Sequence, residues 1–121
     1  MKLTGNRALP DEAARLYREL WISLASVVQS YAAAALLAAP EESYECSRLE
    51  DDRLSIRTKH KQLLLSCDCT AGDGRWEVRS SGAEVLAKGW FSLNALGLVS
   101  VDGHSSVELD AAAEVLAAKI L

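Results

Sequence analysis

The 121 residues of the chain fit one domain, and half of them are apolar while a quarter are charged, which is the composition of a folded globular protein rather than a disordered one. The net charge of −4 argues against a general nucleic-acid-binding protein, because such proteins carry an excess of lysine and arginine. Three cysteines, together with an N-terminus that lacks the apolar core of a signal peptide, predict reduced thiols and a cytoplasmic protein.

The first predicted element is a long helix over residues 10–39, which follows a flexible N-terminus at residues 1–9. Pro10 suits the first helical turn, and Pro40 cannot continue the helix. Residues 20–40 carry no charge and are long enough to span a membrane. Few of them are Leu, Ile or Val, however, and several are serines, so we expect a buried helix of a soluble protein rather than a membrane span.

The apolar face of this helix is wider than one sheet can cover. Apolar residues at spacings of three and four form a main stripe, and a second apolar set widens the face beyond the usual 100°. The helix would be about 45 Å long, whereas a domain of this size is only about 35 Å across. We therefore predict a homodimer whose interface is this second set, namely Trp21, Ile22, Val28, Ala32, Ala35 and Leu36.

From residue 43 the apolar period changes to two, with turn residues at short intervals, which predicts an antiparallel meander of five or six strands. The predicted strands are 43–50, 53–60, 63–70, 75–80, 84–93 and 97–102. A four-residue turn at 71–74 would pair Cys67 with Val78, and would place Leu63, Leu65 and Trp76 on the same buried face.

The last predicted element is a C-terminal helix. Ser105 and Glu108 have the spacing of a capping box, and an apolar stripe follows at Leu109, Ala112, Ala113, Leu116 and Ile120. The sequence thus predicts a single α+β domain over residues 1–121, with two layers and with both helices mainly on one face of the sheet.

The outer face of the predicted sheet combines aromatic and aliphatic residues with basic ones. Exposed apolar residues with a charged rim commonly mark interaction surfaces, although a basic sheet face is more often simply solvated. We predict a non-catalytic, chaperone-like or adaptor-like module that binds a protein or peptide, preferably acidic, on this face. The residues predicted to bind the partner are Trp90, Arg57, Lys59, Arg79, Lys88, Tyr44 and Leu86.

The sequence carries weaker signals for catalysis or metal binding than for partner binding. Cys67 and Cys69 could hold a metal or react with oxidants, but common zinc sites use a Cys-x2-4-Cys turn, so we interpret both thiols as core residues. His60 and His104 lack a matching nucleophile motif. We therefore predict no enzymatic activity, no cofactor and no metal site.

An alternative function comes from the order helix, antiparallel sheet, helix, which is similar to that of frataxin-type proteins. In that family, acids near the first helix and strand handle iron, and the resemblance implies cation handling or a small enzyme. This chain departs from the pattern, because its first helix is largely apolar. Small acidic secretion chaperones also pair helices with a sheet and dimerise, but their interior helix between strands is missing. The acids that the alternative would use are Glu41, Glu42, Glu45, Asp51 and Asp52.

Overall fold

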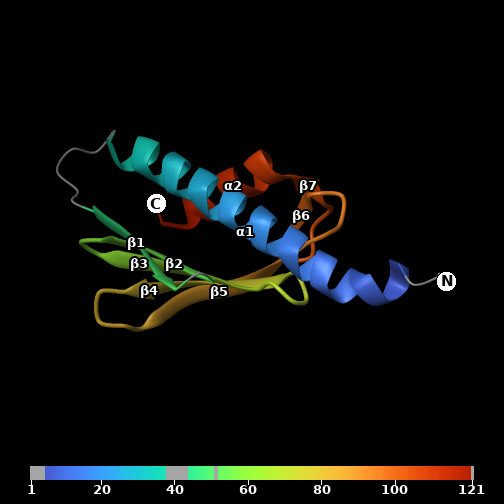
Figure 1. Ribbon diagram of the computed structural model, residues 1–121. Helices are drawn as coiled ribbons and strands as arrows, with labels where there is room; N and C mark the ends of the chain where they lie inside the picture. The colour runs from blue at the N-terminus through green and yellow to red at the C-terminus, as the bar shows by residue number, and fades with distance from the viewer. Residues whose placement is uncertain (1–4, 38–43, 51, 121) are drawn as a thin grey trace.

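The computed structural model describes residues 5–37, 44–50 and 52–120, which form one layer of helices and one antiparallel sheet (Figure 1). The sheet strands are β1 (Tyr44–Glu50), β2 (Arg53–Thr58), β3 (Lys61–Asp68), β4 (Asp73–Ser80), β5 (Val85–Leu93), β6 (Leu98–Val101) and the two-residue β7 (Val107–Glu108). The helices are α1 (Gly5–Leu37) and α2 (Leu109–Ala117), and α2 continues into the 3-10 turn η1 (Ala118–Ile120).

The sheet is a meander in which each strand pairs antiparallel with the next, in the order β1 to β7. Its first six strands match the predicted ones to within a few residues at each end. The α+β fold class is therefore confirmed. The period of two marked these strands correctly because one face of the sheet is covered and the other is not.

Both helices lie on the same face of the sheet, and α2 packs beside α1 (Figure 1). Alternate residues of β3, Leu63, Leu65 and Cys67, point into the core between the layers. From the helix layer, Trp21 reaches this core and stacks on Phe91 of β5, with ring centroids 6.2 Å apart and planes 13° from parallel. The sheet and α1 are thus joined by two large, fully buried rings.

The prediction that the first helix starts at Pro10 is wrong, because α1 begins at Gly5 and includes residues predicted to be flexible. Pro10 is the sixth residue of α1, where it removes one backbone hydrogen bond and its ring crowds the carbonyl of residue 6, so the proline does not mark the start of the helix. At 1.5 Å per residue, the 33 residues of α1 span about 50 Å. Its N-terminal part extends beyond the end of the sheet (Figure 1).

Four residues of the predicted dimer interface contribute instead to the core of the single chain. Trp21, Val28, Ala32 and Leu36 are buried, so a second copy cannot reach them. Of the other two, Ile22 is 41% exposed and Ala35 is half-buried. The prediction failed for the four because α1 has two neighbours, the sheet and α2, and two neighbours bury a wider face than one. A homodimer stays a prediction.

The β3–β4 pairing differs from the predicted one, because Cys67 pairs with Gly74 rather than Val78. The turn falls at residues 69–72, where Asp68 Oδ1 accepts hydrogen bonds from the Thr70 backbone N–H (3.0 Å) and hydroxyl (2.6 Å). Gly72 supplies the left-handed conformation that the turn needs, with φ +75°. The pairing shifts by an even number of residues, so the predicted buried face is still correct.

The predicted capping box is wrong. Val107 and Glu108 form β7, which pairs with Leu98 and Val99 of β6, and Glu108 becomes the N-cap of α2 without a side-chain hydrogen bond. The backbone of Val107 and Glu108 therefore takes part in strand pairing instead of the first turn of a capped helix. The apolar stripe of the helix is confirmed, because Ala112, Ala113, Leu116 and Ile120 are buried and Leu109 packs against the core.

By length and composition, the segment Glu12–Leu36 of α1 could cross a membrane. In the structure, 33% of this apolar stretch is buried inside the fold. Its buried residues, which include Leu24, Ala25 and Val28, belong to the same core as the sheet.

Candidate functional site

The open face of the sheet, which points away from the helices, carries three rows of side chains across β2 to β5. The first row is Arg53, Ser66, Arg75 and Trp90. The second row is Ser55, Leu64, Glu77 and Lys88, and the third row is Arg57, Gln62, Arg79 and Val85. These rows contain five basic residues and one acid, Glu77. A further row across β3 to β5, made of Asp68, Asp73 and Ser92, places two more acids on the same face beside the row of Trp90, so basic residues outnumber acids there by five to three.

Trp90 is the most exposed aromatic residue described on this face, with 57% of its surface accessible. It lies opposite Arg75 on β4, where side chains of paired residues touch. A hollow of about 400 Å³ opens beside the indole and is also lined by Ser66, Asp73 and Arg75. A second hollow of about 250 Å³, which shares Ser66 and Arg75, continues toward Leu64 and Lys88.

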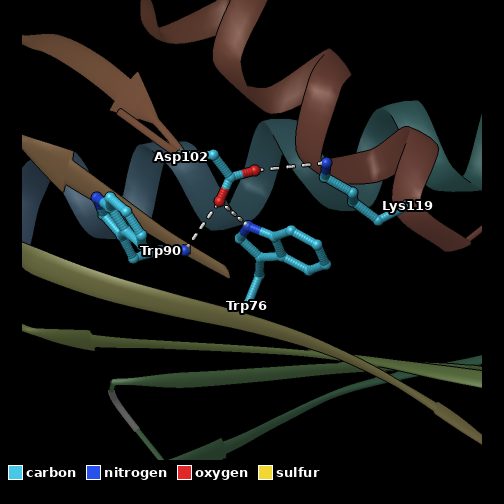
Figure 2. Close-up of polar contacts among 4 residues, drawn as sticks. All are labelled: Trp76, Trp90, Asp102 and Lys119. Atoms are coloured by element: carbon cyan, nitrogen blue, oxygen red, sulfur yellow. Dashed lines mark hydrogen bonds and ion pairs between the residues drawn. The ribbon is translucent and has the colours of Figure 1, made fainter. Parts of the chain in front are cut away.

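Asp102 holds the backbone of Trp90 in place. The Asp102 Oδ1 atom accepts a hydrogen bond from the Trp90 backbone N–H (3.0 Å), and the Asp102 N–H donates to the Trp90 carbonyl (2.8 Å). The same Oδ1 atom also accepts a hydrogen bond from the indole N–H of the buried Trp76 (2.8 Å) (Figure 2). These hydrogen bonds fix the backbone of Trp90, although its exposed side chain contributes little to the core.

The cluster around Asp102 also includes the end of the chain. Lys119 places its ammonium group 3.7 Å from Asp102 Oδ2 and 4.3 Å from the centre of the Trp76 ring (Figure 2). Gly89 leaves the space that this cluster needs, because a Cβ there would overlap Asp102 Oδ1 and the Trp76 indole. Asp102 was not predicted as a site residue, but a buried tryptophan needs an acceptor for its N–H, and this requirement is the signal that could have indicated it.

The structure brings together most of the predicted partner-binding residues, but not all of them. Arg57 and Arg79 share the third row, and Lys88 lies in the second. Lys59 is exposed in the β2–β3 turn. Leu86 is exposed at a bulge, where Ala87 pairs with Val78 and Val85 pairs with Arg79.

Tyr44 lies at the start of β1, where its backbone pairs with Thr58. Its part in partner binding stays a prediction. Arg75 was not predicted as a site residue, but its pairing places it directly across from Trp90.

The acids of the alternative function are only partly described. Glu45 and Asp52 are exposed, whereas Glu41, Glu42 and Asp51 lie outside the described residues. Within the described part of the chain, no three His, Cys, Asp or Glu residues are close enough together to hold a metal ion.

Another hollow, of about 740 Å³, lies between α1 and the ends of β2 and β3, and is lined in part by the two described thiols. Cys67 is buried and Cys69 is half-buried, and neither forms a disulfide. Burial raises the pKa of the Cys67 thiol, and the neighbouring Cys69 raises it further. Hydrogen bonds from the Thr70 hydroxyl and amide lower the pKa of Asp68, so this carboxylate is already engaged in its turn. A thiol that stays protonated is a poor nucleophile.

We expect alkylation of the native protein at pH 8 to label Cys69 at least about tenfold faster than Cys67, because thiolate and access both control the rate. Peptide mass spectrometry after timed iodoacetamide treatment measures both rates. Urea should equalise the two rates by exposing Cys67. Faster labelling of Cys67 in the native protein would contradict the burial of its thiol.

Comparison of the chain with protein-family models, curated proteins and solved structures finds no match in any of the three. The resemblance to frataxin-type proteins in element order therefore gains no support from relatives, and function has to be inferred from the surface itself.

Proposed function

We propose that this protein is a non-catalytic interaction module that binds an acidic segment of a partner protein on the open face of its sheet. The observation that carries the proposal is the exposure of Trp90, which has 57% of its surface accessible. Asp102 meanwhile forms hydrogen bonds with both the backbone N–H and the carbonyl of Trp90. An exposed aromatic side chain on a fixed backbone loses little conformational freedom on binding, which is typical of the anchor residues of interfaces.

The surroundings of Trp90 support a peptide or protein rather than a small substrate. The hollow beside it shares Ser66 and Arg75 with the second hollow, so together they follow the sheet rather than form one enclosed cavity. Small-molecule sites, in contrast, usually bury most of their ligand. The exposed Leu86 extends the apolar area toward the edge of β5.

The charges of the open face support an acidic partner. Arg53 and Arg75 share the row of Trp90, and Lys88 lies in the next row. Basic residues around an apolar anchor accelerate the encounter with an acidic segment and disfavour basic ones. Three acids of this face oppose the effect: Glu77, whose carboxylate is 3.0 Å from the guanidinium of Arg79, and Asp68 and Asp73, which line the hollow beside Trp90.

A phage-displayed random peptide library, selected on the wild-type protein, tests the proposal. We expect enriched peptides to combine acidic residues with an apolar one, and Trp90→Ala to weaken their binding at least about tenfold, as for an interface anchor. Leu96→Ala is the matched control, because Leu96 is a large exposed residue in the β5–β6 turn. Selected peptides that bind Trp90→Ala as tightly as wild type would refute the proposal.

A further inference from the structure

A further hollow lies at the other end of the open face, where two turns meet. The β2–β3 turn and the β4–β5 turn are tied together by a hydrogen bond from the Ser81 backbone N–H to the His60 carbonyl (3.0 Å). The Lys61 N–H donates to the Thr58 hydroxyl (3.1 Å), and the Glu84 N–H donates to the Ser80 hydroxyl (3.2 Å). Both turns are therefore held by their own hydrogen bonds as well as by each other.

Between the turns is a hollow of about 330 Å³, which we call the turn hollow. Its walls carry three cationic side chains, Arg57, Lys59 and Lys61, and the hydroxyls of Ser80 and Ser81. Of the described residues that line it, none is a carboxylate. Two described acids lie close to it: Glu84 in the β4–β5 turn, and Glu45, which pairs with Arg57 across β1 and β2.

Arg57 and Lys59 are exposed at this hollow, and two positive charges on one hollow favour an anion that neutralises them. A phosphate monoester carries a charge of about −1.5 to −2 and three acceptor oxygens, whereas a carboxylate carries one charge and two oxygens. The planar fork of an arginine binds two oxygens of one phosphate, and lysines add charge to the same group. Phosphate therefore matches the cations and hydroxyls of the turn hollow better than a carboxylate does.

We propose that the turn hollow is a binding site for a phosphate group. The site goes beyond the peptide surface at Trp90, and it does not depend on that surface. The row of Arg57 is four residues along the strands from the row of Trp90, which corresponds to about 13 Å at 3.3 Å per residue. Arg57 also lies three strands across the sheet from Trp90, about 14 Å at 4.8 Å per strand, so the separation is about 19 Å. An extended segment held at Trp90 would thus reach the turn hollow with a phosphorylated residue about six positions away.

Titration of the 15N-labelled protein with sodium phosphate, at ionic strength kept constant with sodium chloride, tests the site directly. We expect saturable amide shifts confined to residues 58–62 and 80–84, because these residues form the two turns. Lys59→Glu should weaken phosphate binding at least about tenfold, whereas the matched charge reversal Arg15→Glu, at an exposed residue of α1 outside the hollow, should change it less than about twofold. Shifts that do not saturate, or equal losses in both variants, would overturn the proposal.

Two further titrations separate this site from the peptide surface and identify the source of the phosphate. Trp90→Ala should leave the phosphate titration unchanged, so failure of the peptide surface and failure of the turn hollow give different results. A phosphoserine peptide that binds more tightly than inorganic phosphate, and more tightly than its unphosphorylated form, assigns the phosphate to a modified partner. Equal affinity for the peptide and inorganic phosphate assigns the site to free phosphate.

Discussion

Phe91→Ala is expected to lower the free energy of unfolding by about 3–5 kcal/mol, the usual cost of removing a buried phenylalanine. Phe91 is fully buried and stacks on Trp21, so its loss leaves a cavity at the centre of the contact between α1 and the sheet. Urea unfolding followed by circular dichroism measures the change.

Val115→Ala is the control for this experiment, because Val115 is a large exposed residue of α2 and its truncation should change stability by less than about 0.5 kcal/mol. A loss below about 1.5 kcal/mol for Phe91→Ala would contradict the central position of the ring. Gly74→Ala provides an independent check, because a Cβ at Gly74 would overlap the Phe91 ring. We expect Gly74→Ala to be destabilising in wild type and nearly neutral once Phe91 has become alanine.

Asp102→Ala is expected to lower the free energy of unfolding by about 2–4 kcal/mol. The substitution leaves the buried Trp76 indole N–H and the Trp90 backbone N–H without their acceptor, and an unsatisfied buried donor costs about 1–3 kcal/mol. The ion pair with Lys119 adds little, because both side chains are partly exposed and 3.7 Å apart. Thermal and urea unfolding measure the loss.

Asp102→Asn distinguishes the hydrogen bonds from the charge. The amide oxygen of asparagine can still accept from both donors, so this variant should lose only about 1 kcal/mol. Glu114→Ala, at an exposed position of α2, should be close to neutral. Equal losses for Asn and Ala at position 102 would show that the charge, rather than the acceptor geometry, stabilises the cluster.

The strands were predictable because one face of the sheet is buried and the other is open, which imposes a period of two on the residues from Tyr44 to Val101. The C-terminal stripe from Leu109 to Ile120 was predictable for the same reason, with a period near 3.6. These signals depend on local sequence and on burial alone.

The contacts between distant segments were not predictable in this way. Nothing near α1 in sequence shows that α2 packs beside it. The wide apolar face of α1 was therefore interpreted as a dimer interface. The pairing of Leu98 with Glu108 decided the start of α2 against the local capping signal at Ser105. Likewise, the role of Asp102 depends on Trp76 and Trp90, which are 26 and 12 residues away.

Most of the candidate surface could be predicted, because alternation alone places Trp90, Arg79 and Lys88 outward. Arg75 was overlooked because its importance comes from its cross-strand partner, which follows only from the register of β4 and β5.

The consecutive order of the strands also bears on how the chain reaches its native state. Every hairpin from β1 to β6 joins neighbouring segments, so each can form early at a low cost in loop-closure entropy. The contact between α1 and α2 instead joins the two ends of the chain and closes nearly its whole length. Folding is therefore expected to start in the central hairpins, and the docking of the two helices to complete it.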